Sequence, residues 1–330
     1  MTTLLQTAPS IAMIDAAAAR VAGHVRRTPL LRTPALDALA GRPVLIKAEC
    51  LQHTGSFKYR GAKSAITALC EAGNVTGVVA CSSGNHGQGI ARAAAEAQLD
   101  AVIVLPADAP AAKIAAIRAY GAEIVTYDRQ TGDRDALAAQ ICADRGFPLV
   151  LPFDDPFVIA GQAGVGLELV KQTAEIGVGN ADVLVCCGGG GLSTGIALAL
   201  ERGAPGLRVR TVEPTGFDDM ARALSGNPGP NAPGAKSICD AILTPAPGKL
   251  SLPVLSRLAG SGLTVTDADT LRAMALAFAH LRIVLEPGGA VALAAALSGQ
   301  LDGTGPVIAV ATGGNVDPEI FRKALDCLDD

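Results

Sequence analysis

Four short segments of this 330-residue chain carry groups that could do chemistry together. In the first, residues 55–61, Lys58 follows an aromatic residue, and its amine could form a Schiff base with an aldehyde. The second, residues 82–87, holds two serines, an asparagine and a histidine, and the third is a run of four glycines at 188–191. The fourth, residues 312–315, begins with the neutral hydroxyl of a threonine. Together they supply what is needed to hold pyridoxal phosphate and to do carbanion chemistry on an amino acid.

The order and content of these motifs resemble the serine/threonine dehydratase and serine racemase family. Its members are fold type II pyridoxal-phosphate enzymes related to the tryptophan synthase β chain. The resemblance runs from about Arg26 to Asp317, and four motifs in the right order make it specific where any one alone would be weak. It implies pyridoxal 5′-phosphate as the cofactor, a small amino acid as the substrate and a homodimer as the assembly.

The resemblance assigns cofactor contacts to residues of all four motifs. It implies that Lys58 carries the cofactor and that its freed amine then moves the Cα proton, while Phe57 supplies an apolar wall. It further implies that Asn85 hydrogen-bonds the phenolic O3′ and that Thr312 faces the pyridine nitrogen. A hydroxyl does not hold that nitrogen protonated, which favours prompt β-elimination. The phosphate is expected on the glycine run and the residue after it: Gly188, Gly189, Gly190, Gly191 and Leu192.

The segment 82–87 is expected to bind the substrate, because free N–H groups at a helix start attract a carboxylate. The resemblance gives the carboxylate to the loop amides and two side chains, and it places a proton donor and acceptor at Ser83, on the face opposite the lysine. Serine racemases have serine there, whereas many dehydratases have alanine. An arginine that closes over the carboxylate aligns with Arg134, with Arg129 as a competitor. The expected substrate contacts are Ser82, Ser83, Asn85, His86 and Arg134.

A separate acidic segment, V-E-P-T-G-F-D-D, follows the strand expected at 208–212. Glu213 and Asp219 are spaced as oxygen ligands from one loop, which suits Mg²⁺ or Ca²⁺. In metal-dependent serine racemases and relatives the matching positions are ligands, together with the carbonyl corresponding to that of Phe217. A solvated acidic helix start is the alternative interpretation.

Composition limits the classes of protein to which the chain could belong. Apolar residues make up 49% and charged residues 18%, so a sizeable core can form, and a net charge of -4 disfavours a nucleic-acid partner. The start of the chain lacks the features of a signal peptide, and no apolar run is long enough to predict a membrane span. The eight cysteines are scattered without C-x-x-C spacing, which indicates a reducing cytoplasm.

Short apolar runs alternate with alanine-rich amphipathic segments along the chain. Strands are expected at 44–47, 77–81, 101–105, 123–127, 183–187, 208–212 and 307–311, and helices at 61–71, 88–98, 111–120, 133–145 and 195–200. This alternation predicts an α/β fold of two open, mostly parallel sheets with helices on both faces. The resemblance implies a small α/β domain, 77–154, inserted into a large pyridoxal-phosphate domain made of 1–76 and 155–330. The cofactor would lie in the crevice between them.

We interpret the chain as an ammonia-lyase that dehydrates and deaminates a small β-hydroxy amino acid, L-threonine or L-serine, to a 2-oxo acid and ammonia. A 3-hydroxyaspartate dehydratase is one alternative, and a racemase using Lys58 and Ser83 on opposite faces is the other; elimination and racemisation could coexist. A β-replacement synthase is disfavoured, because those enzymes carry a Thr-Ser-Gly-Asn-Thr loop. A nucleotide-dependent oxidoreductase is disfavoured because the glycines lack G-x-G-x-x-G spacing.

Overall fold

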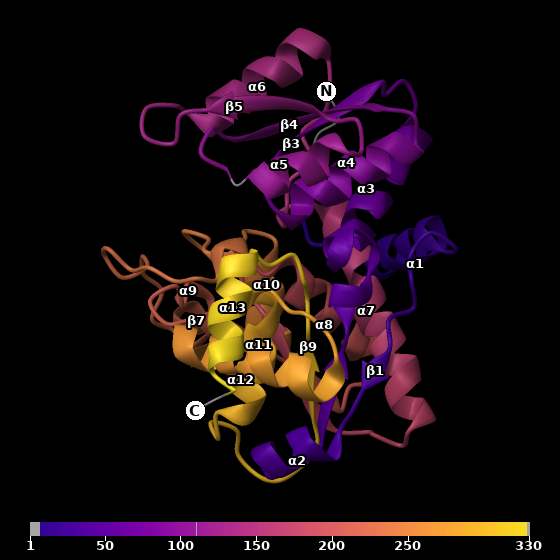
Figure 1. Ribbon diagram of the computed structural model, residues 1–330. Helices are drawn as coiled ribbons and strands as arrows, with labels where there is room; N and C mark the ends of the chain where they lie inside the picture. The colour runs from indigo at the N-terminus through magenta and orange to yellow at the C-terminus, as the bar shows by residue number, and fades with distance from the viewer. Residues whose placement is uncertain (1–6, 110, 329–330) are drawn as a thin grey trace.

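Two lobes, each built around one β-sheet, make up the part of the chain that the computed structural model describes, residues 7–109 and 111–328 (Figure 1). The larger sheet has the strand order β1 (Leu30–Leu31), β2 (Val44–Lys47), β9 (Val307–Val310), β6 (Ala181–Cys186), β7 (Leu207–Pro214) and β8 (Leu263–Val265). The smaller sheet has the order β3 (Gly77–Cys81), β4 (Asp100–Pro106) and β5 (Glu123–Tyr127). β1 pairs antiparallel with β2, and the other neighbouring strands pair in parallel. The predicted fold class is confirmed.

Helices cover both faces of each sheet. The described helices are α1 (Ile11–Val21), α2 (Pro34–Ala40), α3 (Lys58–Ala72), α4 (Asn85–Glu96), α5 (Ala111–Arg118), α6 (Arg134–Arg145), α7 (Pro156–Glu175), α8 (Gly191–Gly203), α9 (Asp219–Leu224), α10 (Ser251–Leu258), α11 (Asp267–Leu281), α12 (Pro287–Leu297) and α13 (Pro318–Asp326). Successive residues of a strand point to opposite faces, so Val78 packs with α3 and α4 whereas Val79 packs with α6. In the large sheet, Val44 likewise faces α11 and α12, and Leu45 faces α7 and α8. In residues 7–109 and 111–328, no helix is long and apolar enough to cross a bilayer.

The expected strands are all present: β2, β3 and β5 match the expected ranges, and the ends of the others differ by at most two residues. β1 and β8 were missed because runs of two and three residues are too short to show an apolar period. Three helices begin earlier than expected: α3 at Lys58 rather than 61, α4 at Asn85 rather than 88, and α8 at Gly191 rather than 195. Lys58, Asn85 and His86 therefore stand in the first turns of helices, whereas Ser82 and Ser83 stay in the loop before α4.

The small sheet starts at Gly77, the expected start of the inserted domain, and an isolated bridge from Val79 to Leu149 extends it. Asp155, directly after the expected end of that domain, caps the N-terminus of α7. However, α3 lies before residue 77 and packs against the small sheet through Tyr59. The division into 77–154 and a large domain of 1–76 and 155–330 stays a prediction, and residues 1–6 lie outside the described residues.

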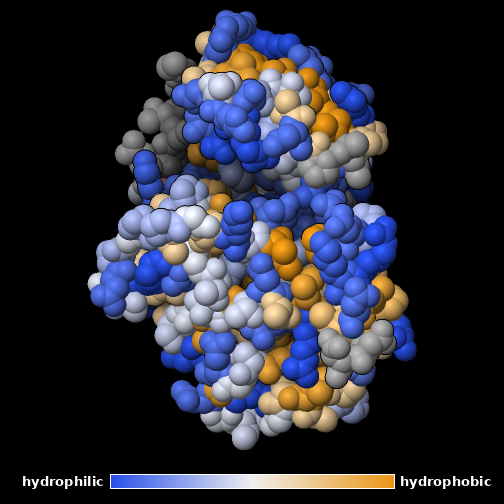
Figure 2. Space-filling model, turned by 60° about the vertical axis from the view of Figure 1, so that its left-hand side comes forward, coloured by the Kyte–Doolittle hydropathy of each residue, from blue (hydrophilic) through white to orange (hydrophobic). Residues whose placement is uncertain are grey.

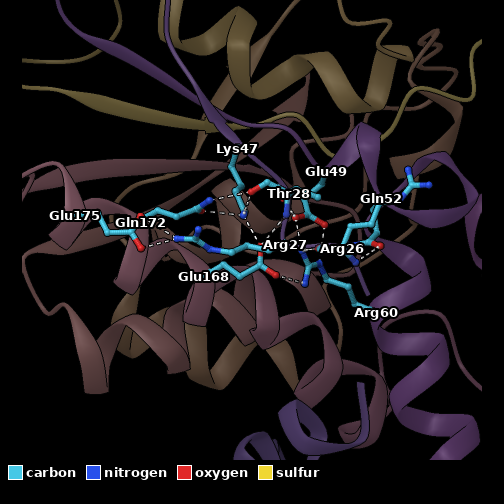
Figure 3. A network of polar contacts seen from close by, with 10 residues as sticks. All are labelled: Arg26, Arg27, Thr28, Lys47, Glu49, Gln52, Arg60, Glu168, Gln172 and Glu175. Carbon is cyan, nitrogen blue, oxygen red and sulfur yellow. Dashed lines mark hydrogen bonds and ion pairs between the residues drawn. The ribbon is translucent and has the colours of Figure 1, made fainter. Parts of the chain in front are cut away.

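A buried network of charges ties α3 to the large sheet (Figure 3). The Arg60 guanidinium donates two hydrogen bonds to Glu49, both of 2.8 Å, and one of 2.7 Å to Glu168 on α7. Lys47, at the end of β2, donates to Glu168 at 2.5 Å and to the Thr28 carbonyl at 2.8 Å. Burial alone would raise the pKa of Glu49, but the adjacent Arg60 holds it below its usual value. Two cations and two carboxylates balance one another, with Lys47, Glu49 and Arg60 buried and Glu168 partly buried.

Removing one member of this network should be costly, because it leaves a buried charge without its partner. We expect Arg60→Met to lower the free energy of unfolding by about 3–5 kcal/mol, measured by urea denaturation. The double variant Arg60→Met/Glu49→Leu should recover part of that loss. Arg27→Gln breaks an exposed pair with Glu175 and should leave stability nearly unchanged. Equal losses in Arg60→Met and Arg27→Gln would contradict a structural role for the network.

Candidate active site

A cavity of about 310 Å³ lies between the lobes and is lined by residues from both. Figure 2 shows that the surface narrows between the lobes and that hydrophilic residues dominate the narrow part. The walls include the carboxyl ends of β3, β6 and β9, the edge at which open parallel sheets present their ligand sites. The cavity collects all the residues expected to touch cofactor or substrate: Phe57, Lys58, Ser82, Ser83, Asn85, His86, Arg134, Gly188, Gly189, Gly190, Gly191, Leu192 and Thr312.

Backbone hydrogen bonds join the lysine segment to the threonine segment. β2 and β9 are neighbours in the large sheet, and the chain beyond each continues the contact. Phe57 N donates to Thr312 O at 3.0 Å, and Gly314 N donates to Gly55 O at 2.9 Å. The lysine motif, 55–61, and the threonine motif, 312–315, are far apart in the sequence. They lie side by side because β2 and β9 are neighbours in the sheet.

Lys58 is the first residue of α3, and its side chain lines the cavity. Its Nζ donates to the Pro152 carbonyl at 2.9 Å and lies 5.2 Å from the centre of the Phe57 ring. Removal from water lowers the pKa of Lys58 to about 8. A substantial share of the amine is therefore neutral in mildly alkaline solution, the form that reacts with a carbonyl.

The glycine run 188–191 lies between the end of β6 and the start of α8. A Cβ at Gly189 would overlap the Phe153 ring, and Gly190 has φ +88°, a backbone conformation that favours glycine. Both positions therefore require a residue without a side chain. The bare backbone and the N-terminus of α8 form a cradle in which N–H groups could bind a phosphate.

The serine segment ends in the first turn of α4, whose free N–H groups favour an anion. Ser82 Oγ accepts a hydrogen bond from Gly84 N at 3.2 Å, and Ser83 is half-buried in the cavity wall. Burial lowers the pKa of His86 to about 3, so its imidazole is neutral. His86 Nε2 lies 2.9 Å from the Val150 carbonyl and must donate to it, which leaves Nδ1 as an acceptor. A carboxylate would therefore meet the backbone N–H of His86 rather than its ring.

Thr312 is buried at the end of β9, beside the end of β6. Its Oγ1 lies 3.3 Å from the Cys186 thiol, in a hydrogen bond that either group could donate. Burial raises the pKa of Cys186 to about 11, so this thiol stays protonated. The Thr312 hydroxyl and the Cys186 thiol therefore carry no formal charge. An uncharged partner of this kind is expected for a pyridine nitrogen that is not protonated.

Glu286 also lines the cavity and was missed from the sequence. It precedes Pro287, the first residue of α12, and its Oε1 accepts a hydrogen bond from Asn85 Nδ2 at 2.6 Å. Burial raises the pKa of Glu286 to about 7. A glutamate before a proline is an ordinary helix start, so nothing local in the sequence marks this residue as part of the site.

Charged side chains from the small lobe stand at the cavity rim. Lys113 pairs with Asp240 of the large lobe at 2.6 Å, a contact between segments that sequence reasoning did not join. Arg134 lines the cavity, but its Nε donates to Asp135 at 2.8 Å and its side chain is 51% exposed. Arg129, its competitor, lines the same cavity and pairs with an aspartate of the small lobe.

The expected metal ligands Glu213, Phe217 and Asp219 lie outside the cavity, where β7 leads into α9. Glu213 accepts from Met220 N at 2.9 Å and from the next backbone N–H at 2.7 Å, so it caps α9. Asp219 is buried, and its Oδ2 has no hydrogen-bond partner in the described residues. The described part of the chain holds no cluster of three or more His, Cys, Asp or Glu side chains suited to a metal.

The residues in the cavity fit pyridoxal phosphate. The amine of Lys58 matches its aldehyde, the bare backbone at 188–191 matches its phosphate, and the hydroxyl of Thr312 offers a neutral partner for its ring nitrogen. Asn85 supplies an amide on the opposite lobe. This set of donors also agrees with the placement of the site between two α/β lobes.

Known proteins with similar sequences and structures include ammonia-lyases and amino-acid racemases. An L-threo-3-hydroxyaspartate ammonia-lyase of Pseudomonas sp is 39% identical over 310 residues, 94% of this chain and 96% of that protein. A serine racemase of Oryza sativa subsp. indica is 35% identical over 324 residues, 96% of this chain and 94% of that protein. The solved structure of maize serine racemase superimposes with a TM-score of 0.88 at 34% identity and covers 98% of each chain. The solved structure of a T.th. threonine deaminase superimposes with a TM-score of 0.87 at 41% identity, over 94% of this chain and 99% of that one.

The family described as pyridoxal-phosphate dependent enzyme matches residues 21–313. The resemblance to serine/threonine dehydratases and serine racemases, and with it the fold type II architecture, is confirmed. The cofactor that the cavity fits and the family that matches most of the sequence agree, and the chain belongs to the pyridoxal-phosphate dependent enzymes, in the group of ammonia-lyases and amino-acid racemases.

Proposed function

We propose that the protein is an ammonia-lyase that eliminates water from a small β-hydroxy amino acid, L-threonine or L-serine, and yields a 2-oxo acid and ammonia. The observation that carries the proposal is the convergence of three groups in one cavity: the Lys58 amine, the phosphate cradle 188–191 and the uncharged Thr312. An uncharged partner for the ring nitrogen suits prompt elimination. Relatives of this chain include ammonia-lyases for hydroxyaspartate and threonine.

Pyridoxal phosphate, when bound, supplies an aldehyde for the substrate amine and a ring that withdraws electrons from Cα. The backbone N–H groups at the start of α4 and the Ser82 hydroxyl bind the substrate carboxylate and so orient the Cα–H bond. The Lys58 amine, whose pKa burial lowers to about 8, takes the Cα proton in its neutral form and returns a proton to the departing hydroxyl. Phe57 lines the cavity beside Lys58 and presents an apolar surface to these atoms.

A second candidate substrate is 3-hydroxyaspartate, which carries an additional carboxylate. Besides Lys58, three cations line the cavity, Lys113, Arg129 and Arg134, against two carboxylates, Asp240 and Glu286. Each of these three cations is paired with an aspartate, so a second substrate carboxylate would have to replace one of those partners. The 39% identity with a hydroxyaspartate ammonia-lyase supports the same candidate.

The first test concerns the role of Lys58. The purified protein should be yellow with bound pyridoxal phosphate, and borohydride reduction followed by peptide mapping should place the pyridoxal label on Lys58. Lys58→Ala should abolish the label and 2-oxo acid formation, because the amine that binds the cofactor and moves the proton is gone. A label on Lys63 or Lys47, two buried lysines that serve as internal controls, would overturn the assignment.

The same preparation decides the substrate. Formation of 2-oxo acid and ammonia should be measured with L-serine, L-threonine and L-threo-3-hydroxyaspartate, and the first two should react. Turnover of hydroxyaspartate alone would favour the second candidate, and Lys113→Met should then raise KM for hydroxyaspartate selectively. A yellow protein that releases ammonia from none of the three would contradict the proposed function.

Racemisation is a further candidate activity, supported by the place of Ser83 in the cavity wall and by the racemases among the relatives. Lys58 would reach one face of Cα, so inversion needs a second proton donor, for which we propose Ser83.

Ser83→Ala should therefore keep elimination of an L-substrate and lose racemisation together with elimination from D-serine. Chiral chromatography of serine incubated with each protein provides the measurement, and Ser82→Ala serves as the neighbouring control. Equal loss of elimination and racemisation in Ser83→Ala would show that Ser83 only supports the loop.

We also propose a divalent cation, Mg²⁺ or Ca²⁺, at Glu213, the Phe217 carbonyl and Asp219. The buried, unpartnered Oδ2 of Asp219 supports it, as does burial that raises the pKa of Glu213 to about 8, since a cation would compensate both carboxylates. Glu213 would keep one lone pair on each oxygen for the N–H groups of α9.

If the cation binds the folded state alone, a hundredfold excess over its Kd stabilises the protein by about 2.7 kcal/mol. Chelation should then lower the melting temperature, and Mg²⁺ or Ca²⁺ should restore it. Asp219→Ala should abolish this response while pyridoxal phosphate still binds, and Asp218→Ala, which alters the adjacent carboxylate, should retain it. An unchanged melting curve in metal-free chelator would leave Glu213 as a helix cap only.

Two further expectations concern the assembly and its surroundings. We propose a homodimer, as the family resemblance implies, and light scattering would report its mass. The cysteines are free thiols, which supports the proposed cytoplasmic location.

A further inference from the structure

Two side-chain amides and one carboxyl group form a chain of hydrogen bonds that runs from the large lobe to the small one and back. Asn315 Nδ2 donates to Asn85 Oδ1 at 2.7 Å, and Asn85 Nδ2 donates to Glu286 Oε1 at 2.6 Å. Asn315 and Glu286 belong to the large lobe, whereas Asn85 opens α4 of the small lobe. All three residues line the cavity, and we call them the amide relay.

Acceptors at both ends give the relay a single direction. Asn315 Nδ2 also donates to the Thr54 carbonyl at 2.8 Å, and a carbonyl can only accept. The nitrogen of Asn315 must therefore face Asn85, which has to present its oxygen there. The nitrogen of Asn85 then points to Glu286, whose carboxylate accepts it. The orientation of the Asn85 amide follows from these partners and needs no other information.

This direction leaves one hydrogen of the relay without a protein acceptor. Asn315 uses both hydrogens of its amide nitrogen, one on Thr54 and one on Asn85. Asn85 uses one of its two on Glu286, and the hydrogen bonds of the described residues provide no acceptor for the other. Because Asn85 lines the cavity, that hydrogen is available to a bound molecule.

The backbone around the relay is shaped to hold it. Thr54 has φ +60°, a left-handed conformation that is a rare outlier for a β-branched residue, and it places its carbonyl on Asn315. A Cβ at Gly55 would come within 2.5 Å of Asn315 Oδ1, and a Cβ at Gly313 would overlap Glu286 Oε1. Small residues and an unfavourable backbone conformation thus make room for these two side chains.

Resting on the proposed function, we propose that Glu286 and Asn315 are positioning residues that turn the free amide hydrogen of Asn85 toward the phenol oxygen of pyridoxal phosphate. A fixed N–H donor stabilises the deprotonated form of that oxygen and costs no reorganisation when the cofactor binds. The resemblance assigns the contact with O3′ to Asn85 alone, whereas the relay explains why the amide presents its nitrogen and not its oxygen.

The test reads the visible absorption of the protein loaded with pyridoxal phosphate, whose bands differ for the protonated and deprotonated phenol. Glu286→Met removes the acceptor, so Asn85 can turn its oxygen to the cofactor. The ratio of protonated to deprotonated phenol at a given pH should then rise about tenfold, the factor that one hydrogen bond to a charged group supplies. Glu286→Gln keeps an acceptor oxygen and should restore the wild-type ratio of the bands.

A double-mutant cycle separates positioning from bulk destabilisation. Glu286→Met/Asn85→Ala should show the same band ratio as Asn85→Ala alone, because Glu286 acts through Asn85. Gln172→Met is the matched control, since it removes a buried hydrogen bond to Lys47 far from the relay and should lower the melting temperature without moving the bands. If Glu286→Met does not fold, Asn315→Leu frees the same amide from its other side and should shift the ratio in the same direction.

The relay is overturned if the wild type is yellow while Glu286→Met and Asn315→Leu keep its band ratio, or if the shifts of the double variant add. A wild type that binds no pyridoxal phosphate would overturn the proposed function and the relay together. The two failures are therefore distinguishable from the colour of the unaltered protein.

Discussion

Arg60 and Glu49 are both withdrawn from water, and each charge is tolerable there only because of the other. Their contact fixes α3 to the start of η1 (Glu49–Leu51), directly after β2, while Glu168 extends it to α7. Lys58 stands two residues before Arg60 on the same helix. The position of the reactive amine is therefore set by a buried ion pair that takes no part in the chemistry.

Close approach of two helices completes this constraint. A Cβ at Gly61 would come within 2.8 Å of a carbonyl of α7, and a Cβ at Gly161 within 2.6 Å of the Arg60 carbonyl. Glycines on both helices allow the separation at which Arg60 reaches Glu168. The cavity then forms between this rigid unit and the small lobe, and cross-lobe contacts at Asn85 and Lys113 close it.

The cavity holds its reactive groups in unusual protonation states by burial. The pKa of Lys58 falls to about 8, whereas that of Glu286 rises to about 7, so both groups change charge near neutral pH. Such pairs are characteristic of sites that move protons. The relatives nevertheless divide among hydroxyaspartate ammonia-lyases, serine racemases and threonine ammonia-lyases, although fold and cofactor family are shared. The shared architecture does not decide the outcome of the reaction. Ser83 and Lys113 are the side chains that we propose to influence it.

The sequence alone determined the fold class, the cofactor family and the set of residues for which we propose roles in the chemistry. Each of those features can be recognised from residues close together in the sequence. Lys58 follows Phe57 in the segment 55–61, and the glycine run 188–191 follows an apolar strand. Short apolar runs alternate with alanine-rich amphipathic segments. The tertiary structure alone decided what supports these residues. Glu286 meets Asn85 across 201 positions of sequence, so no local pattern marks that contact. Burial, which lowers the pKa of both Lys58 and His86, arises only when both lobes enclose the same cavity, and a linear chain carries no sign of it.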